Sequence, residues 1–147
     1  MTELTEELQD RVDLIKHKLK FIEQKPAVAC ITQLQTLTFA DDNLIQSLNI
    51  AGGESATLDV NPDIIIVMPE DYSIEQTIKE IGALMQLPNF TELKAVKNNR
   101  LYIADGTQNV TTNPESSVNQ LENLAEIINP KQFIFGNEGE SWVKFSL

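Results

Sequence analysis

The feature that most constrains the fold of this chain is a short, unbroken apolar segment, Ile64 to Met68, in the stretch NPDIIIVMPEDYS. A continuous apolar run of this length is typical of a strand that is covered on both faces. The segments 27–33 and 100–104 are also short and largely apolar. We therefore expect a sheet with three buried strands, at 27–33, 63–68 and 100–104.

Four other segments place apolar residues at the spacing of a helix. The first covers 3–24 and has one apolar stripe, made by Leu4, Leu8, Val12, Ile15, Leu19 and Ile22. Such a stripe suits either a coiled-coil seam or a helix lying across a sheet or a lobe, and we favour the second. The other three helices are predicted to begin at capping residues and to end at glycine or proline, with starts at Asp41 or Asp42, Ser73 and Asn113 and ends at Gly52-Gly53, Pro88 and Asn129-Pro130.

Strands that alternate with helices predict an α/β fold with right-handed crossovers. We expect a three-layer sandwich with a small, mostly parallel sheet, preceded by the long N-terminal helix. The chain is accordingly divided into 1–26, the amphipathic helix, and 27–147, a single α/β lobe. The tail after Phe133 has two apolar patches around a Gly-Asn-Glu-Gly turn and suits either a hairpin or a single edge strand.

Charge excludes several classes of partner. The 147 residues carry 22 acids against 11 bases, a formal net charge of −11. We therefore do not expect nucleic acids or anionic membrane surfaces as partners, because both require a basic face. No apolar segment is long enough for a membrane span, so we expect no membrane insertion. The acidic start MTELTEELQD is not a secretory signal, so we expect a cytoplasmic protein, the alternative being a protein whose leader has been removed.

No catalytic constellation is visible in the sequence. It contains no glycine-rich phosphate loop and no G-x-S-x-G motif, and its one histidine, His17, lies between lysines in the first helix, where we expect it to be solvated. The single cysteine, Cys30, lies in an apolar segment and is predicted to be buried. Asp41-Asp42 and Glu70-Asp71 are read as caps and loop residues rather than metal ligands. We therefore predict no enzyme activity, no cofactor and no metal.

The parallel sheet does predict one place for a ligand. Ligands of open α/β sheets bind outside the carboxyl ends of the strands, so the polar residues that follow the three strands should meet along one edge. These residues supply amides, hydroxyls, acids and one aromatic ring, which suits a small polar solute, a metal chelate or a protein surface. The candidate ligand-binding residues are Gln33, Gln35, Glu70, Asp71, Tyr72, Asn109 and Thr112.

Several segments, in this order, resemble a known family. They are AGG, then NPDIIIVMP, then LPNFTELKAVKNNRLYIADGT, then LENLAEIINPKQF. Together they resemble the C-terminal lobe of the substrate-binding proteins of ABC importers for cobalamin and iron siderophores, over roughly residues 27–133. In that family one long helix joins two lobes, and residues 3–24 look like that helix. Members are usually periplasmic or surface-anchored.

The sequence departs from the family where the cleft would lie. Thr32-Gln33 stands where members usually carry Glu-Trp, and Glu70-Asp71 follows Pro69 where they carry Cys-Gly. An Arg-Pro-Gly-Pro-Arg segment before the last helix is replaced by 112–116, TNPES. The resemblance implies a non-enzymatic solute-binding-like domain with replaced cleft residues. The alternative is a protein-interaction module without a small ligand.

We also expect a homodimer, because the stripe from Leu4 to Ile22 needs apolar cover that a second lobe would otherwise supply. An exposed apolar stripe of this size would be unusual on a monomer.

Overall fold

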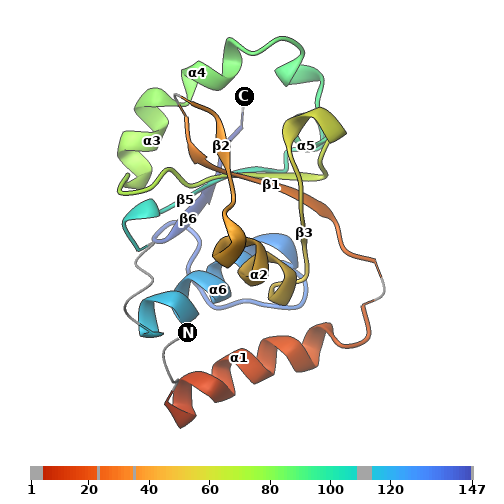
Figure 1. Ribbon diagram of the computed structural model, residues 1–147, viewed down its shortest axis with the longest axis vertical. Coiled ribbons are helices and arrows are strands. Elements are labelled where there is room, and N and C mark those ends of the chain that lie inside the picture. Colours follow the sequence, from red (N-terminus) through yellow and green to blue (C-terminus); the bar gives the residue numbers. More distant parts are fainter. Residues whose placement is uncertain (1–4, 23, 35, 109–113, 147) are drawn as a thin grey trace.

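The computed structural model describes residues 5–22, 24–34, 36–108 and 114–146, and Figure 1 shows its arrangement. It has a mixed, mostly parallel sheet in the order β2 (Thr38–Phe39), β1 (Ala27–Gln33), β4 (Ile64–Val67), β5 (Leu101–Ala104), β6 (Trp142–Lys144). The short β3 (Glu54–Ser55) also pairs with β1. The three predicted strands are parallel neighbours at its centre, while β2 and β6 are antiparallel edges.

Helices cover both faces of the sheet, as Figure 1 shows. On one face lie α2 (Asp42–Ile50) and α6 (Pro114–Ile128), with α1 (Glu6–Leu19) packed outside them. On the other face lie the short helices α3 (Ile74–Glu80), α4 (Gly82–Met85) and α5 (Lys94–Lys97). Single 3₁₀ turns cover Leu58–Val60, Phe90–Glu92 and Gly106–Gln108. The predicted α/β sandwich with a preceding helix is therefore confirmed, whereas the division of the chain at residue 26 stays a prediction.

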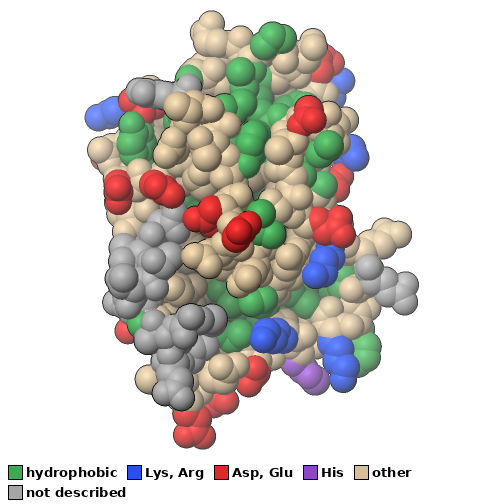
Figure 2. All heavy atoms as spheres, in the orientation of Figure 1, with side chains coloured by type: hydrophobic (Ala, Val, Ile, Leu, Met, Phe, Trp, Pro, Cys, Tyr) green, Lys and Arg blue, Asp and Glu red, His purple; other side chains and the backbone are tan. Residues whose placement is uncertain are grey.

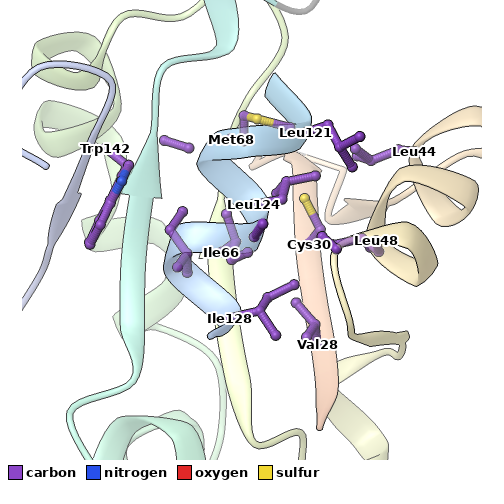
Figure 3. Close-up of a cluster of buried hydrophobic side chains, with 14 of the residues drawn as sticks. Val28, Cys30, Leu44, Leu48, Ile66, Met68, Leu121, Leu124, Ile128 and Trp142 are labelled. Atoms are coloured by element: carbon purple, nitrogen blue, oxygen red, sulfur yellow. The ribbon is translucent and has the colours of Figure 1, made fainter. Parts of the chain in front are cut away.

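The central strands are buried on both sides. In β1, Val28 and Cys30 contribute to the core under α2 and α6, whereas Ala29 and Ile31 contribute to the core under α3 and α4. Figure 3 shows the first of these cores, in which Ile66 from β4 and Leu124 from α6 lie near these β1 side chains. Two-sided burial explains why these strands consist of continuous apolar residues rather than of alternating polar and apolar ones.

Local chain geometry differs from the predictions in three places. α1 begins after Thr5, which caps it, and ends at Leu19, because 3₁₀-type hydrogen bonds of Lys20 and Ile22 to carbonyls three residues earlier unwind the predicted last turn. The predicted helix after Ser73 divides into α3 and α4, although its predicted capping box with Gln76 is present. β2, β3 and α5 were not predicted, because elements of two to four residues are too short to show a periodic pattern.

The middle of the apolar stripe of the first helix is covered within the chain, whereas Leu19 and Ile22 are only partly buried. Leu8, Val12 and Ile15 are buried and belong to the core formed with α6. Arg11, beside them, donates from Nε to Glu122 Oε2 at 3.1 Å and from Nη2 to Asn119 Oδ1 at 2.6 Å, both on α6. The stripe is thus a contact within the lobe rather than a coiled-coil seam, which removes the reason for the predicted homodimer. Leu4 lies outside the described residues.

A buried carboxylate holds the C-terminal segment against α6. Glu126 is 5% exposed and accepts hydrogen bonds from the backbone N–H groups of Phe135, Gly136 (3.0 Å) and Asn137 (3.3 Å). It also accepts one from Trp142 Nε1 at 2.7 Å. The segment between α6 and β6 is therefore fixed by one side chain, and the tail forms a single edge strand rather than a hairpin.

Replacing Glu126 by alanine is expected to lower the free energy of unfolding by about 2–4 kcal/mol, because four donors lose a buried acceptor. Glu126→Gln keeps one carbonyl oxygen, so its free energy of unfolding should lie between those of the unmodified chain and Glu126→Ala. Urea denaturation followed by the fluorescence of Trp142 measures both. Glu75→Gln, at an exposed position of α3, is the control and should change stability by less than about 0.5 kcal/mol. Equal stability of Glu126→Ala and the control would show that the carboxylate is not a structural acceptor.

The predicted burial of Cys30 is confirmed, and it has a consequence for alkaline stability. Burial, with a smaller contribution from the charge of Asp41, raises the pKa of this thiol from 9.0 to about 12. The unfolded chain loses the thiol proton first as pH rises, so the native state loses stability between these two pKa values, by at most about 1.4 kcal/mol per pH unit. Cys30→Ala should be less stable at pH 7 but show a shallower decline above pH 9. Parallel declines of the two proteins would contradict this.

Candidate functional site

A groove of about 690 Å³ lies at the carboxyl ends of β1 and β4, where helices α2, α6 and α1 meet this edge of the sheet. Its walls combine residues from all of these elements. Its apolar residues are Val12, Phe39, Leu44, Ile50, Pro114, Val118 and Leu121, and its polar residues are Thr32, Gln33, Thr38, Asp41, Asn43, Gln46, Ser47, Glu70, Ser117 and Gln120.

The strand ends fix the floor of the groove through backbone hydrogen bonds. Glu70 leaves the end of β4 with its N–H bonded to the carbonyl of Thr32, 3.0 Å away, so these two chain segments stay side by side. The Thr32 hydroxyl donates to the carbonyls of Thr38 (3.3 Å) and Phe39 (3.2 Å), which fastens the β1–β2 turn. The Gln33 side chain accepts a hydrogen bond from Thr36 Oγ1 at 2.7 Å within the same turn. The floor is therefore polar.

Two helices supply polar walls. Asp41 caps α2 by accepting from the Leu44 N–H at 2.9 Å, and Asn43 and Ser47 follow one turn apart on the groove side. From α6, Ser117 adds a hydroxyl group to the facing wall. The opposite stripe of each helix is buried in the core shown in Figure 3, so helix packing determines which polar side chains enter the groove.

The groove contains carboxylates but no basic side chain. No lysine, arginine or histidine lines it among the described residues. The sequence also has none between Pro26 and Ile78 or between Leu101 and Pro130, which together include every segment that follows a central strand at this edge. Asp41 and Glu70 therefore give the groove a negative charge. Such a site favours neutral or cationic ligands and repels anionic ones.

The predicted site residues are separated by the structure. Gln33 and Glu70 line the groove together. Asp71 does not line it; its backbone has φ 64° and its N–H bonds to the carbonyl of Gly106. Tyr72 also lies outside it, where a hydrogen bond with Glu80 of α3 raises the pKa of its phenol. The other three predicted residues, Gln35, Asn109 and Thr112, lie outside the described residues.

The prediction missed the helical contributors to the groove, chiefly Asn43, Gln46, Ser47, Ser117 and Gln120. A usable signal existed in the sequence. These residues are all uncharged and polar, a composition that suits the wall of a binding groove. Periodicity alone could not have shown that the polar sides of two helices more than 60 residues apart in the chain face one groove.

The described part of the chain shows no group of three or more histidine, cysteine, aspartate or glutamate side chains that could hold a metal ion. His17 is exposed, as predicted. Across the same residues, none of the helices combines the length and the apolar character needed to cross a membrane.

Comparison with known proteins identifies the fold. No protein-family model and no curated protein sequence matches the chain. Among solved structures it is similar to an ABC transporter substrate-binding protein from Listeria monocytogenes EGD-e (18% identity, TM-score 0.71, 85% of this chain and 55% of the other). It is also similar to IsdE of S. aureus, solved with heme, at 23% identity and a TM-score of 0.67, over 84% of this chain and 56% of IsdE. A third similar structure is an ABC-type Fe³⁺-hydroxamate transport protein from Saccharomonospora viridis DSM 43017, at 19% identity and a TM-score of 0.61, over 84% of this chain and 47% of the other.

These similarities confirm the fold that the sequence resemblance predicted, that of one lobe of an ABC-importer substrate-binding protein. The chain spans about half the length of the structures it matches: 46%, 55% and 50% of the first three. At identities of 16–23%, the likeness concerns the fold and not the ligand.

The turn below the groove depends on Gly106. A Cβ atom at this position would lie 1.8 Å from the carbonyl oxygen of Pro69, a backbone atom that cannot rotate away. Gly106→Ala should therefore displace the 69–72 turn and lower the free energy of unfolding by about 1–3 kcal/mol or more. Gly82→Ala is the matched control, because its Cβ meets nothing within 4 Å and helix propensity favours alanine. Thermal denaturation of both variants tests this, and Gly106→Ala should have the lower melting temperature. Equal melting temperatures would refute the steric argument.

Proposed function

We propose that this chain is a non-enzymatic solute-binding-like domain whose ligand occupies the groove at the carboxyl ends of β1 and β4. The observation that carries the proposal is the groove itself, whose volume of about 690 Å³ falls in the usual range for ligand sites. It lies at the strand ends where open α/β sheets bind ligands. Its amides and hydroxyls suit hydrogen bonding to a polar solute.

The charge of the groove narrows the class of ligand. Solved structures of this fold include a protein crystallised with heme and one named for Fe³⁺-hydroxamate transport. Heme carries propionate carboxylates, which a groove containing Asp41 and Glu70 and no basic side chain would repel. In a ferric trihydroxamate three hydroxamate anions neutralise the iron. A neutral or cationic chelate of this kind therefore fits the groove better than heme.

The side chains of the groove support binding rather than catalysis. The hydroxyl of Thr32 is committed to backbone carbonyls, and among the described residues that line the groove there is no histidine or lysine to act as a base for a hydroxyl. A nucleophile without a base or a lowered pKa is weak.

A protein-interaction module is the second candidate, and one observation favours it. Phe21 and Ile134 are 79% and 86% exposed, an uncommon exposure for large apolar side chains. Both lie close in sequence to the contact between Lys18 and the Phe133 ring, 5.4 Å from the Lys18 Nζ atom to the ring centroid. A contact surface here would be separate from the groove.

The cytoplasmic location and the homodimer also stay predictions, to be tested by fractionation and sedimentation.

Titration of the purified protein with a neutral ferric trihydroxamate, heme and cobalamin tests the proposal. Trp142 fluorescence and the melting temperature are followed together, since a ligand of the native state raises the melting temperature. We expect a saturable response to the trihydroxamate and a weaker one, or none, to heme. Gln33→Ala with Glu70→Ala should weaken trihydroxamate binding about five- to tenfold, which is the loss of one to two hydrogen bonds.

Glu75→Gln, on the opposite side of the sheet, is the control and should bind like the unmodified chain. Tighter binding of heme than of the trihydroxamate would refute the charge argument while leaving the groove as a site. No response to any of the three ligands, with a folded protein, would reject the solute-binding proposal for these classes and favour the interaction module.

A further inference from the structure

A second, smaller pocket lies where the end of α1 and the segment after it approach the end of α2. It has a volume of about 190 Å³ and is lined by Lys16, Leu19, Lys20, Ile22, Lys25, Asn49, Ile50 and Gly52. Gly52 has φ 97°, and a Cβ atom there would lie 2.6 Å from Asn129 Nδ2 and 3.1 Å from Leu19 Cδ1. Only a glycine lets the two helix ends come this close, so the pocket has a closely packed floor.

The charge of this pocket is opposite to that of the groove. Three lysines line it, and no acidic residue does so among the described residues. Figure 2 shows Lys and Arg side chains gathered at this end of the molecule, over the second half of α1. Five of the eleven basic residues lie within 15 positions of a chain with net charge −11, namely Arg11, Lys16, Lys18, Lys20 and Lys25.

Among the described residues, none of the three lysines that line the pocket has a salt-bridge partner. The salt bridges of the described chain involve Arg11, Lys94 and Lys97, not Lys16 or Lys20. Lys25 donates only to a carbonyl, that of Asn49, at 3.1 Å. Lys16, in the last turn of α1, and Lys20, its C-cap residue, are four positions apart, a spacing at which like charges repel. An anion between them would remove this repulsion.

Stabilisation of the C-terminal end of α1 explains only in part why lysines gather there. Cations near a helix C-terminus interact favourably with its dipole. That effect does not require a concave site, nor an apolar wall next to the charges. Leu19, Ile22 and Ile50 are only partly buried and supply such a wall.

We propose that this pocket binds a small aliphatic carboxylate. The carboxylate lies between the ammonium groups of Lys16 and Lys20, and its short carbon chain contacts Leu19, Ile22 and Ile50. The volume is several times the roughly 30 Å³ that one water molecule occupies in the liquid, enough for a short chain but not for a metal chelate. The site is separate from the groove and does not depend on its function.

The test is a titration of the ¹⁵N-labelled chain with hexanoate at low salt, followed by amide chemical shifts, with 1-hexanol and inorganic phosphate as matched probes. We expect saturable shifts at Leu19 and Gly52 with hexanoate, and clearly weaker affinity for the other two probes. Ser117 reports on the groove and should not shift. Because the lysines are exposed, binding should weaken at high salt.

Charge-matched variants complete the test. Lys16→Gln with Lys20→Gln should weaken hexanoate binding about four- to twenty-five-fold, because each exposed lysine contributes a factor of about two to five. Lys79→Gln with Lys144→Gln makes the same change in net charge elsewhere and should leave binding unchanged. Equal binding of hexanoate and hexanol would show an apolar depression only and overturn the proposal. So would the absence of saturation, or an equal loss in both double variants.

Discussion

The two-sided burial of three parallel strands is the constraint on which the rest of this structure depends. β1, β4 and β5 satisfy their backbone groups by pairing with each other and with the short flanking strands, and they bury their apolar side chains against helices on both faces. This requirement fixes the positions of α2 and α6 on one face and the short helices on the other. It also directs the ends of β1 and β4 to one edge, where the chain must turn into water.

The groove is a consequence of that edge. Strand ends cannot be covered by the same helices that cover the strand centres, so polar residues collect there and the surface is concave between α2, α6 and the sheet. The close approach of Gly106 to Pro69 keeps the turn after β4 pressed against the turn after β5. Solved substrate-binding proteins share this fold, and the ligand preference proposed for this chain comes from the charges that its own sequence places there.

Charge is distributed unevenly over the molecule, and the distribution separates its two concave sites. Among the described residues, two acidic and no basic residues line the groove, whereas three lysines and no acidic residue line the pocket at the end of α1. Ile50 lines both the groove and the pocket, so two neighbouring sites carry opposite charges. A single anionic or cationic ligand would not occupy both, so the two proposals can fail or succeed independently.

The sequence alone was enough to predict the three central strands and the starts of the main helices, because their signals are local, but not the short elements β2, β3 and α5. Continuous apolar runs identified the buried strands, Ser73 and Gln76 identified a helix start, and the lack of bases after each strand could be read without a structure. It could not determine the site, because adjacent residues in a turn point in different directions. Glu70 enters the groove, whereas Asp71 and Tyr72 do not. Only tertiary packing decided that polar residues of α2 and α6, far apart in the chain, join Gln33 and Glu70, since the apolar sides of these helices had first to be buried against the sheet.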